Sequence, residues 1–110
     1  MNSIAEDTKM VNLGRWTLME AFINQAVKHD CSVIKKKEKY YFGNAPKASC
    51  PNISVDYRDH VYFNGIHGAE VKIGQEGRIN IKKLGLLYAR FKEEISGGLK
   101  GAILGVLEGK

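Results

Sequence analysis

The sequence has few or none of the features that mark membrane proteins, secreted proteins and disulfide scaffolds. No stretch approaches the roughly 18 consecutive apolar residues that a membrane-spanning helix requires. The opening segment MNSIAEDTKM contains no apolar core of a secretion signal. The chain has only two cysteines, Cys31 and Cys50, too few for a disulfide scaffold. We therefore expect a cytoplasmic protein with reduced thiols and no membrane partner.

Motifs of common enzymes are absent as well. The sequence contains no G-x-S-x-G element, no phosphate-binding glycine loop and no H-E-x-x-H pair. Cys31 would follow the C-terminal end of a helix, and Cys50 has no histidine close to it in sequence. Neither thiol is therefore placed to become a reactive thiolate. We expect no catalytic residues, no cofactor and no enzymatic activity.

The side chains that could bind a metal lack the paired spacing typical of a structural zinc site. They are His29, Cys31, Cys50, His60 and His67. His60 and His67 could share one face of a hairpin, because they lie on either side of Asn64-Gly65. Surface histidines and small buried thiols are the commoner arrangement, so we predict no metal site.

The length and charge of the chain indicate one domain with an anionic partner. The 110 residues suffice for a single modest core, with residues 1–7 expected to be disordered and residues 99–110 to form a tail helix. The composition, 44% hydrophobic and 26% charged, is that of an ordinary globular protein. The net charge of +5 favours nucleic acid or another polyanion.

A helix is predicted from Thr17 to about Asp30, after a short strand at residues 8–13. Thr17 and Glu20 have the spacing of a capping box, in which each side chain bonds the other residue's backbone N–H. The apolar residues behind this cap recur at helical spacing and predict one buried face. They are Leu18, Met19, Phe22, Ile23, Ala26 and Val27.

The middle of the chain predicts antiparallel strands. Residues 31–36 and 39–42 form the first two, and Ile53, Val55 and Tyr57 alternate with polar residues in a third. Turns are expected at residues 43–46 and 49–52, which contain both prolines. Asn64-Gly65 predicts a type I′ hairpin turn, since both of its central residues tolerate positive φ. Residues 74–77 predict another turn, after which RINI could be a short strand or lead into a helix.

Two helices are predicted at the C-terminal end. An apolar stripe predicts the first from Lys82 to Ile95, and Gly97-Gly98 should end it. The stripe consists of Leu84, Leu87, Tyr88, Phe91 and Ile95. The second is a glycine-rich tail helix whose apolar positions could dock on the domain, on a second subunit or on a partner. Those positions are Leu99, Ala102, Ile103, Val106 and Leu107.

These elements predict an α+β fold in which a mostly antiparallel sheet carries two main helices on one face. Four segments resemble a family of small uncharacterised proteins encoded as hypothetical open reading frames in plastid and cyanobacterial genomes. They are TKMVNL, YYFGNAPKAS, RDHVYFNGIHGAEVKI and LYAR, within residues 8–95. The resemblance implies a ferredoxin-like α+β sandwich, and it implies no activity and no functional residue.

A lysine- and tyrosine-rich segment, Val33–Ala48, is the candidate binding surface. Nucleic-acid binding needs cations for phosphates and flat rings for bases. In a strand, Lys39 and Tyr41 share one face, whereas Tyr40 and Phe42 face the core. Arg90 on the last main helix could extend the basic surface. The predicted nucleic-acid-binding residues are Lys35, Lys36, Lys37, Lys39, Tyr41, Lys47 and Arg90.

Other interpretations of the sequence remain open. The lysines could instead protect an edge strand from aggregation, which is a common use of lysine. The protein could be an adaptor or inhibitor that binds another protein through a sheet edge or through the apolar tail, and it could form a homodimer. A metal-assisted nuclease is a further alternative, because Asp56 and Glu70 could lie on adjacent strands near Lys72.

Overall fold

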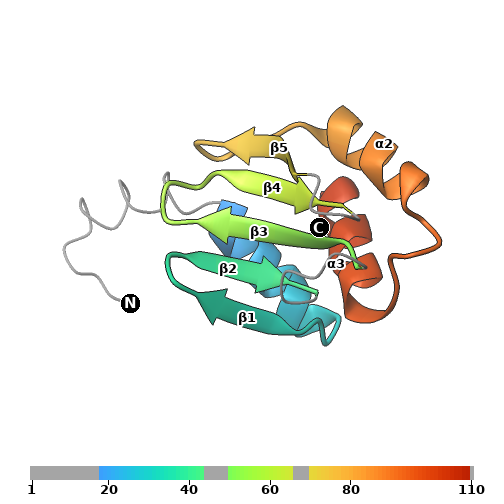
Figure 1. The fold of residues 1–110 in the computed structure, drawn as a ribbon, viewed down its shortest axis with the longest axis horizontal. Helices are drawn as coiled ribbons and strands as arrows, with labels where there is room; N and C mark the ends of the chain where they lie inside the picture. Colours follow the sequence, from blue (N-terminus) through green and yellow to red (C-terminus); the bar gives the residue numbers. More distant parts are fainter. Residues whose placement is uncertain (1–17, 44–49, 66–69, 110) are drawn as a thin grey trace.

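The computed structural model describes residues 18–43, 50–65 and 70–109 of the chain. It confirms the α+β class: a helix over residues 18–28 precedes a six-stranded antiparallel sheet, and two helices follow it (Figure 1). The strands are β1 (Val33–Lys36), β2 (Lys39–Phe42), β3 (Asn52–Asp56), β4 (Val61–Asn64), β5 (Glu70–Gln75) and β6 (Arg78–Ile79). The later helices are α2 (Ile81–Arg90) and α3 (Gly97–Leu107).

The strands follow one another across the sheet in chain order, β1 to β6, so each pairs with its neighbour in sequence. A ferredoxin-like sandwich instead has the order β-α-β-β-α-β, with helices between strands. Within the described residues, every helix lies before β1 or after β6. The ferredoxin-like arrangement implied by the family resemblance is therefore not confirmed.

One face of the sheet, the covered face, packs against all three described helices (Figure 1). Phe22 of the first helix lies against Phe42 of β2, with ring centroids 5.7 Å apart. Leu84 of α2 and Ile103 of α3 are fully buried in the same cluster. Every second residue of the central strands joins this core, as the period of a half-buried strand requires. These strand residues are Phe42, Ile53, Val55, Val61, Phe63 and Ile73.

The first helix is confirmed, but its predicted buried face is too wide. Leu18, Phe22 and Ala26 are buried, one turn apart, and they define the side that faces the sheet. Val27 is 78% exposed, so its predicted place in the core is wrong. Because successive helical residues are about 100° apart, Val27 lies well round the helix from Ala26.

A distant aspartate caps this helix. Oδ1 of Asp59, between β3 and β4, accepts hydrogen bonds from the backbone N–H groups of Leu18 (3.1 Å) and Met19 (3.2 Å). Its Oδ2 accepts from the N–H of Gly77 at 2.6 Å. Burial raises the pKa of Asp59, while these three N–H donors act in the opposite direction. Asp59 thus ties the helix start to two turns of the sheet.

The glycine-rich tail helix docks on its own domain. Gly98 lies against the backbone of Cys31, where an added Cβ would be 2.6 Å from the Cys31 nitrogen. Gly101 likewise lies against the His29 ring, and Gly105 against the Gln25 side chain. These glycines therefore let α3 approach the end of the first helix closely. Leu99, Ala102 and Ile103 of the same helix are buried in the core.

The predicted stop at Gly97-Gly98 is wrong. The last main helix, α2, ends at Arg90, and the backbone N–H of Phe91 bonds the carbonyl oxygen of Leu87. Ile95 is buried, but it lies beyond the helix. Gly97, with φ of 59°, is the first residue of α3. The glycine pair therefore begins a helix that needs close contact with Cys31.

The hairpin of β4 and β5 is confirmed, but its type I′ turn at Asn64-Gly65 is wrong. Asn64 is a strand residue paired with Glu70, and neither Asn64 nor Gly65 has positive φ. The turn with two positive φ values lies between β5 and β6, at Glu76 (50°) and Gly77 (77°). The second predicted turn and the short strand after it are thus confirmed.

Several predictions fall outside the described residues. They are the strand at residues 8–13, the Thr17 cap, the turn residues 44–49, Lys47 and His67. Within the described parts of the chain, no helix is long and apolar enough to cross a membrane.

Candidate nucleic-acid interface on the open sheet face

The candidate site is the sheet face opposite the helices, here called the open face. Residues paired directly across antiparallel strands share a face. The register places Tyr41 of β2 opposite Ser54 of β3, and Ser54 opposite Tyr62 of β4. Ile34 of β1 and Lys72 of β5 extend this row at its two ends. One row of side chains therefore crosses five strands and contains two tyrosines.

Tyr41 and Tyr62 are separated by β3, whose short side chains on this face, Ser54 and Asn52, form a low surface between the rings, here called the low floor. Neighbouring strands are about 4.8 Å apart, so the Tyr41 and Tyr62 backbones are separated by about 10 Å. Ser54 between them is fully buried, as is its neighbour Asn52 on the same face. The Nδ2 of Asn64 donates to Asn52 Oδ1 at 2.8 Å and to Ser54 Oγ at 3.2 Å. Hydrogen bonds within the sheet thus hold this polar floor in place.

Lys39 of β2 reaches far across the open face. Its Nζ lies 4.8 Å from the centroid of the Tyr62 ring on β4. The same Nζ is 3.6 Å from Oε2 of Glu70 on β5. This one side chain therefore links β2 to β5 and covers part of the Tyr62 ring.

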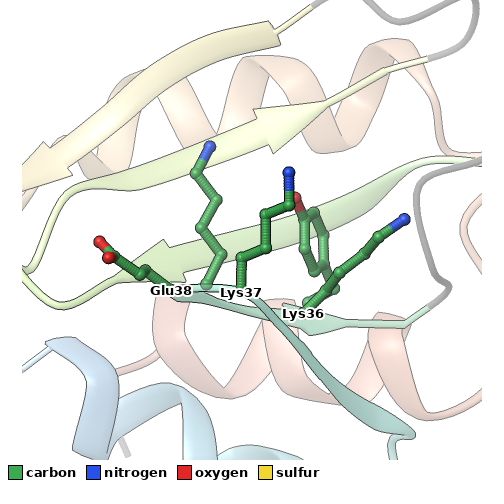
Figure 2. Close-up of a pocket in the computed structure, with 5 residues that line it drawn as sticks. Lys36, Lys37 and Glu38 are labelled. Carbon is green, nitrogen blue, oxygen red and sulfur yellow. The ribbon is translucent and has the colours of Figure 1, made fainter.

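A hollow at the β1–β2 hairpin lies beside this row. It has a volume of about 670 Å³ and is lined by Lys36, Lys37, Glu38, Lys39 and Tyr41. Figure 2 shows Lys36 and Lys37 extending over the same side of the hairpin, while Glu38 points away from them. Lys37 adopts φ of 58° in the two-residue turn that connects the strands. Three lysines, one glutamate and one tyrosine thus line a space large enough for a small ligand, although the Lys39 ammonium group itself extends away toward Tyr62 and Glu70.

His60 and Asp56 lie next to each other on the open face, beside Lys39. Oδ1 of Asp56 accepts hydrogen bonds from the backbone N–H groups of Arg58 (3.0 Å) and His60 (2.9 Å). Nδ1 of His60 lies 3.6 Å from Asp56 Oδ2. The His60 ring meets Tyr62 edge-on, with centroids 6.5 Å apart. The backbone contacts fix Asp56, and the carboxylate in turn orients His60 beside the tyrosine.

The structure brings together some of the predicted site residues and separates others. Lys36, Lys37, Lys39 and Tyr41 meet at the hollow. Lys35 pairs with Tyr40, so it belongs to the covered face, and its Nζ lies 5.9 Å from the Tyr40 ring centroid. Lys47 lies outside the described residues.

Arg90 belongs to a different part of the molecule. Its guanidinium lies 5.3 Å from the Phe91 ring centroid, at the end of α2. Because α2 packs against β5, Arg90 lies toward the opposite edge of the sheet from the β1–β2 hairpin.

Two residues of the open face, Tyr62 and Lys72, were not predicted from the sequence as part of the candidate surface. The signal was present, since Val61 and Phe63 face the core and the residue between them must face outward. The same reasoning applies to Lys72, which precedes the buried Ile73. Alternation predicts the face of each residue, but only the register shows that Tyr62 and Lys72 share a row with Tyr41.

The residues considered for other chemistry lie apart. Asp56 is on β3 and Glu70 on β5, with β4 between them, so their expected placement on adjacent strands is wrong. No cluster of three or more possible metal-binding side chains occurs in the described parts of the chain. Cys31 and Cys50 are not joined by a disulfide, and burial raises the pKa of Cys31, which disfavours its thiolate.

Comparisons with protein-family models, with curated proteins and with solved structures found no match to this chain. The open face combines lysines and exposed aromatic surface, which are the two components of a site for a nucleic-acid chain.

Proposed function

We propose that this is a non-enzymatic, cytoplasmic binding protein whose ligand is a polyanion, with nucleic acid favoured. The observation that carries the proposal is the hollow lined by Lys36, Lys37, Lys39 and Tyr41. Three cations within one small region attract successive phosphates of a chain, and the ring supplies a surface for a base. The net charge of +5 would speed the encounter with such a ligand.

The proposal predicts binding that weakens strongly with salt. Each phosphate neutralised by a lysine releases condensed counterions, so the logarithm of the affinity falls linearly with that of the salt concentration. Contacts to three phosphates give a slope of roughly −2 for single strands. Fluorescence anisotropy of labelled single-stranded RNA, single-stranded DNA and duplex at several salt concentrations measures this slope.

A matched pair of variants tests whether the hollow is the site. Lys36→Gln/Lys37→Gln/Lys39→Gln removes its cations. Lys28→Gln/Lys92→Gln/Lys100→Gln removes the same charge from exposed positions outside the hollow. We expect the first triple variant to lose at least tenfold in affinity and the second to lose about threefold or less. Equal losses would show that only the net charge matters, and no binding by the wild type at low salt would reject the proposal.

A second candidate function uses the edge of the same hairpin. Among the described strands β1 pairs with β2 alone, and Val33 and Ile34 are 41% and 38% exposed. An extended acidic peptide, or a second copy of the chain, could add a strand at this edge. Binding through main-chain hydrogen bonds would survive salt better than phosphate binding, and sedimentation would detect self-association. The burial of Leu99, Ala102 and Ile103 argues against the apolar tail as the binding surface, although Val106 and Leu107 are only partly buried.

A further inference from the structure

The contacts of Lys39 define a feature that charge alone does not explain. The ammonium group extends from β2 to lie over the Tyr62 ring, and Glu70 of β5 holds it there. Tyr62 stands in the same row as Tyr41, and Ser54 forms the low floor between them. The row therefore contains two rings, and Lys39 occupies part of the surface of one of them.

We infer that the open face is a platform for single-stranded nucleic acid, on which Tyr41 and Tyr62 stack unpaired bases and Lys39 is a displaceable cover of Tyr62. This inference rests on the proposed function and specifies its ligand. When a base stacks on Tyr62, Lys39 leaves the ring and Glu70 and contacts a phosphate of the bound chain.

The preference for a single strand follows from the rings. Bases within a duplex are stacked on one another, so they offer phosphates and groove edges but no free faces. An unpaired base has a free face that can stack on an aromatic side chain, largely irrespective of sequence. Tyr41 and Tyr62 are about 10 Å apart with the short, buried Ser54 between them, so Lys39, which crosses β3 to reach Tyr62, is the long side chain that two neighbouring bases would have to displace.

The magnitudes favour displacement of Lys39. Stacking of one base on an aromatic side chain is worth about 5- to 150-fold in affinity. An exposed cation–π contact is worth about 2- to 5-fold, and an exposed ion pair at most about 5-fold. The Lys39 and Glu70 side chains are 32% and 46% exposed, so these exposed-site values apply. The released lysine also gains a phosphate contact.

Because Glu70 holds Lys39 over the Tyr62 ring, Glu70 opposes the binding of a base, and its replacement should raise the affinity for a single strand. Glu70→Gln should tighten the binding of a single strand, because it frees Lys39 and removes a negative charge from the face. Glu93→Gln makes the same change of charge at an exposed position in the turn after α2. We expect Glu70→Gln to bind at least threefold more tightly than Glu93→Gln, a gain that unfolding could not produce.

The experiment measures the anisotropy of labelled ten-nucleotide single-stranded DNA, single-stranded RNA and the matched duplex at one low salt concentration. We expect wild type to bind at least one of the single strands tenfold more tightly than the duplex. Tyr62→Ala should lose at least fivefold for that strand and less for the duplex, and Tyr62→Phe, which keeps the ring, should recover most of the loss. The two single strands show whether the sugar matters.

Different results would reject the stacking platform and the proposed polyanion site. If single strand and duplex bind equally, or if Tyr62→Ala or Glu70→Gln leaves single-strand affinity unchanged, the stacking platform is wrong. The polyanion site stands in those cases, provided that the triple lysine variant of the hollow still loses binding. If wild type binds none of the nucleic acids, both are wrong.

Discussion

The two faces of the sheet are built from the same strands but are held in different ways. On the covered face, large apolar side chains such as Phe42 and Phe63 are completely buried against three helices. On the open face, Tyr62 and Lys39 are partly exposed, and their contacts are between side chains. Changes to the first face should therefore alter stability, whereas changes to the second should alter binding.

The largest expected effect is on the covered side, at the contact between α3 and Cys31. A Cβ in Gly98→Ala would meet the Cα and nitrogen of Cys31, and backbone atoms cannot swing aside. We expect a loss of about 3 kcal/mol or more in the free energy of unfolding, measured by urea denaturation. The control is Gly85→Ala in α2, whose Cβ would have only Leu107 within 4 Å, at 4.0 Å. The better helix propensity of alanine should stabilise that variant by up to about 1 kcal/mol, and equal losses in both would contradict the packing argument.

The Asp59 cap should give the next largest effect. In Asp59→Asn, one oxygen can still accept from Leu18 and Met19, but an NH₂ group then faces the N–H of Gly77. A buried donor without its acceptor costs about 1–3 kcal/mol. Denaturation at neutral pH measures this loss, and Asp56→Asn, at the end of β3, is a less buried control. A change below 0.5 kcal/mol at Asp59 would show that the cap contributes little.

The titration of Asp59 should make the free energy of unfolding change with pH in one direction. Because burial raises the pKa of Asp59 above its ordinary 3.8, the folded protein holds this proton more tightly than the unfolded chain does. The resulting stabilisation is present below pH 3.8 and is lost as the pH rises through the folded-state pKa. The stability difference between wild type and Asp59→Asn should therefore shrink as the pH rises over this interval. Urea titrations at a series of pH values measure it, and a difference that grows with pH would reverse the assignment.

The smallest expected effect is at Lys37, where a substitution should change both the stability of the protein and its proposed binding of nucleic acid. Lys37 adopts φ of 58°, which is unfavourable for any side chain with a Cβ. Lys37→Gly should therefore stabilise the protein by about 0.5 kcal/mol while it weakens nucleic-acid binding. Lys37→Gln removes the same charge without relieving the backbone, so it should weaken binding equally and leave stability unchanged. Thermal melting and anisotropy together separate these effects, and equal melting temperatures would argue against strain at Lys37.

Local patterns predicted much of this molecule correctly. The alternation of Lys39 and Tyr41 with Tyr40 and Phe42 placed each on the correct face, because the period of a strand is a local property. The pairing of β4 with β5 was also predicted. The tail helix was recognised from the spacing of its apolar residues, although its docking site remained open.

The errors arose where a distant contact decides the structure. Gly97-Gly98 has the composition of a helix end, and nothing near it in sequence reveals that Cys31 lies against it. Asn64-Gly65 has the composition of a tight turn, yet the pairing of Asn64 with Glu70 places Asn64 in the strand.

The candidate site, too, could be predicted only as far as its residues are close together in sequence. The lysines and Tyr41 of the hairpin were found from composition. The contact of Lys39 with Glu70 depends on how the four strands β2 to β5 are arranged, and the sequence alone contains no signal for it.

The docking of α3 also bears on how the protein is made. During synthesis, the first helix and the six described strands leave the ribosome before α3, which supplies Leu99, Ala102 and Ile103 to the core. Until then, the core cluster that contains Phe22 and Phe42 lacks these three residues. Incomplete cores of this kind are prone to aggregation and are bound by chaperones. The domain should therefore complete its folding only after α3 has emerged from the ribosome exit tunnel.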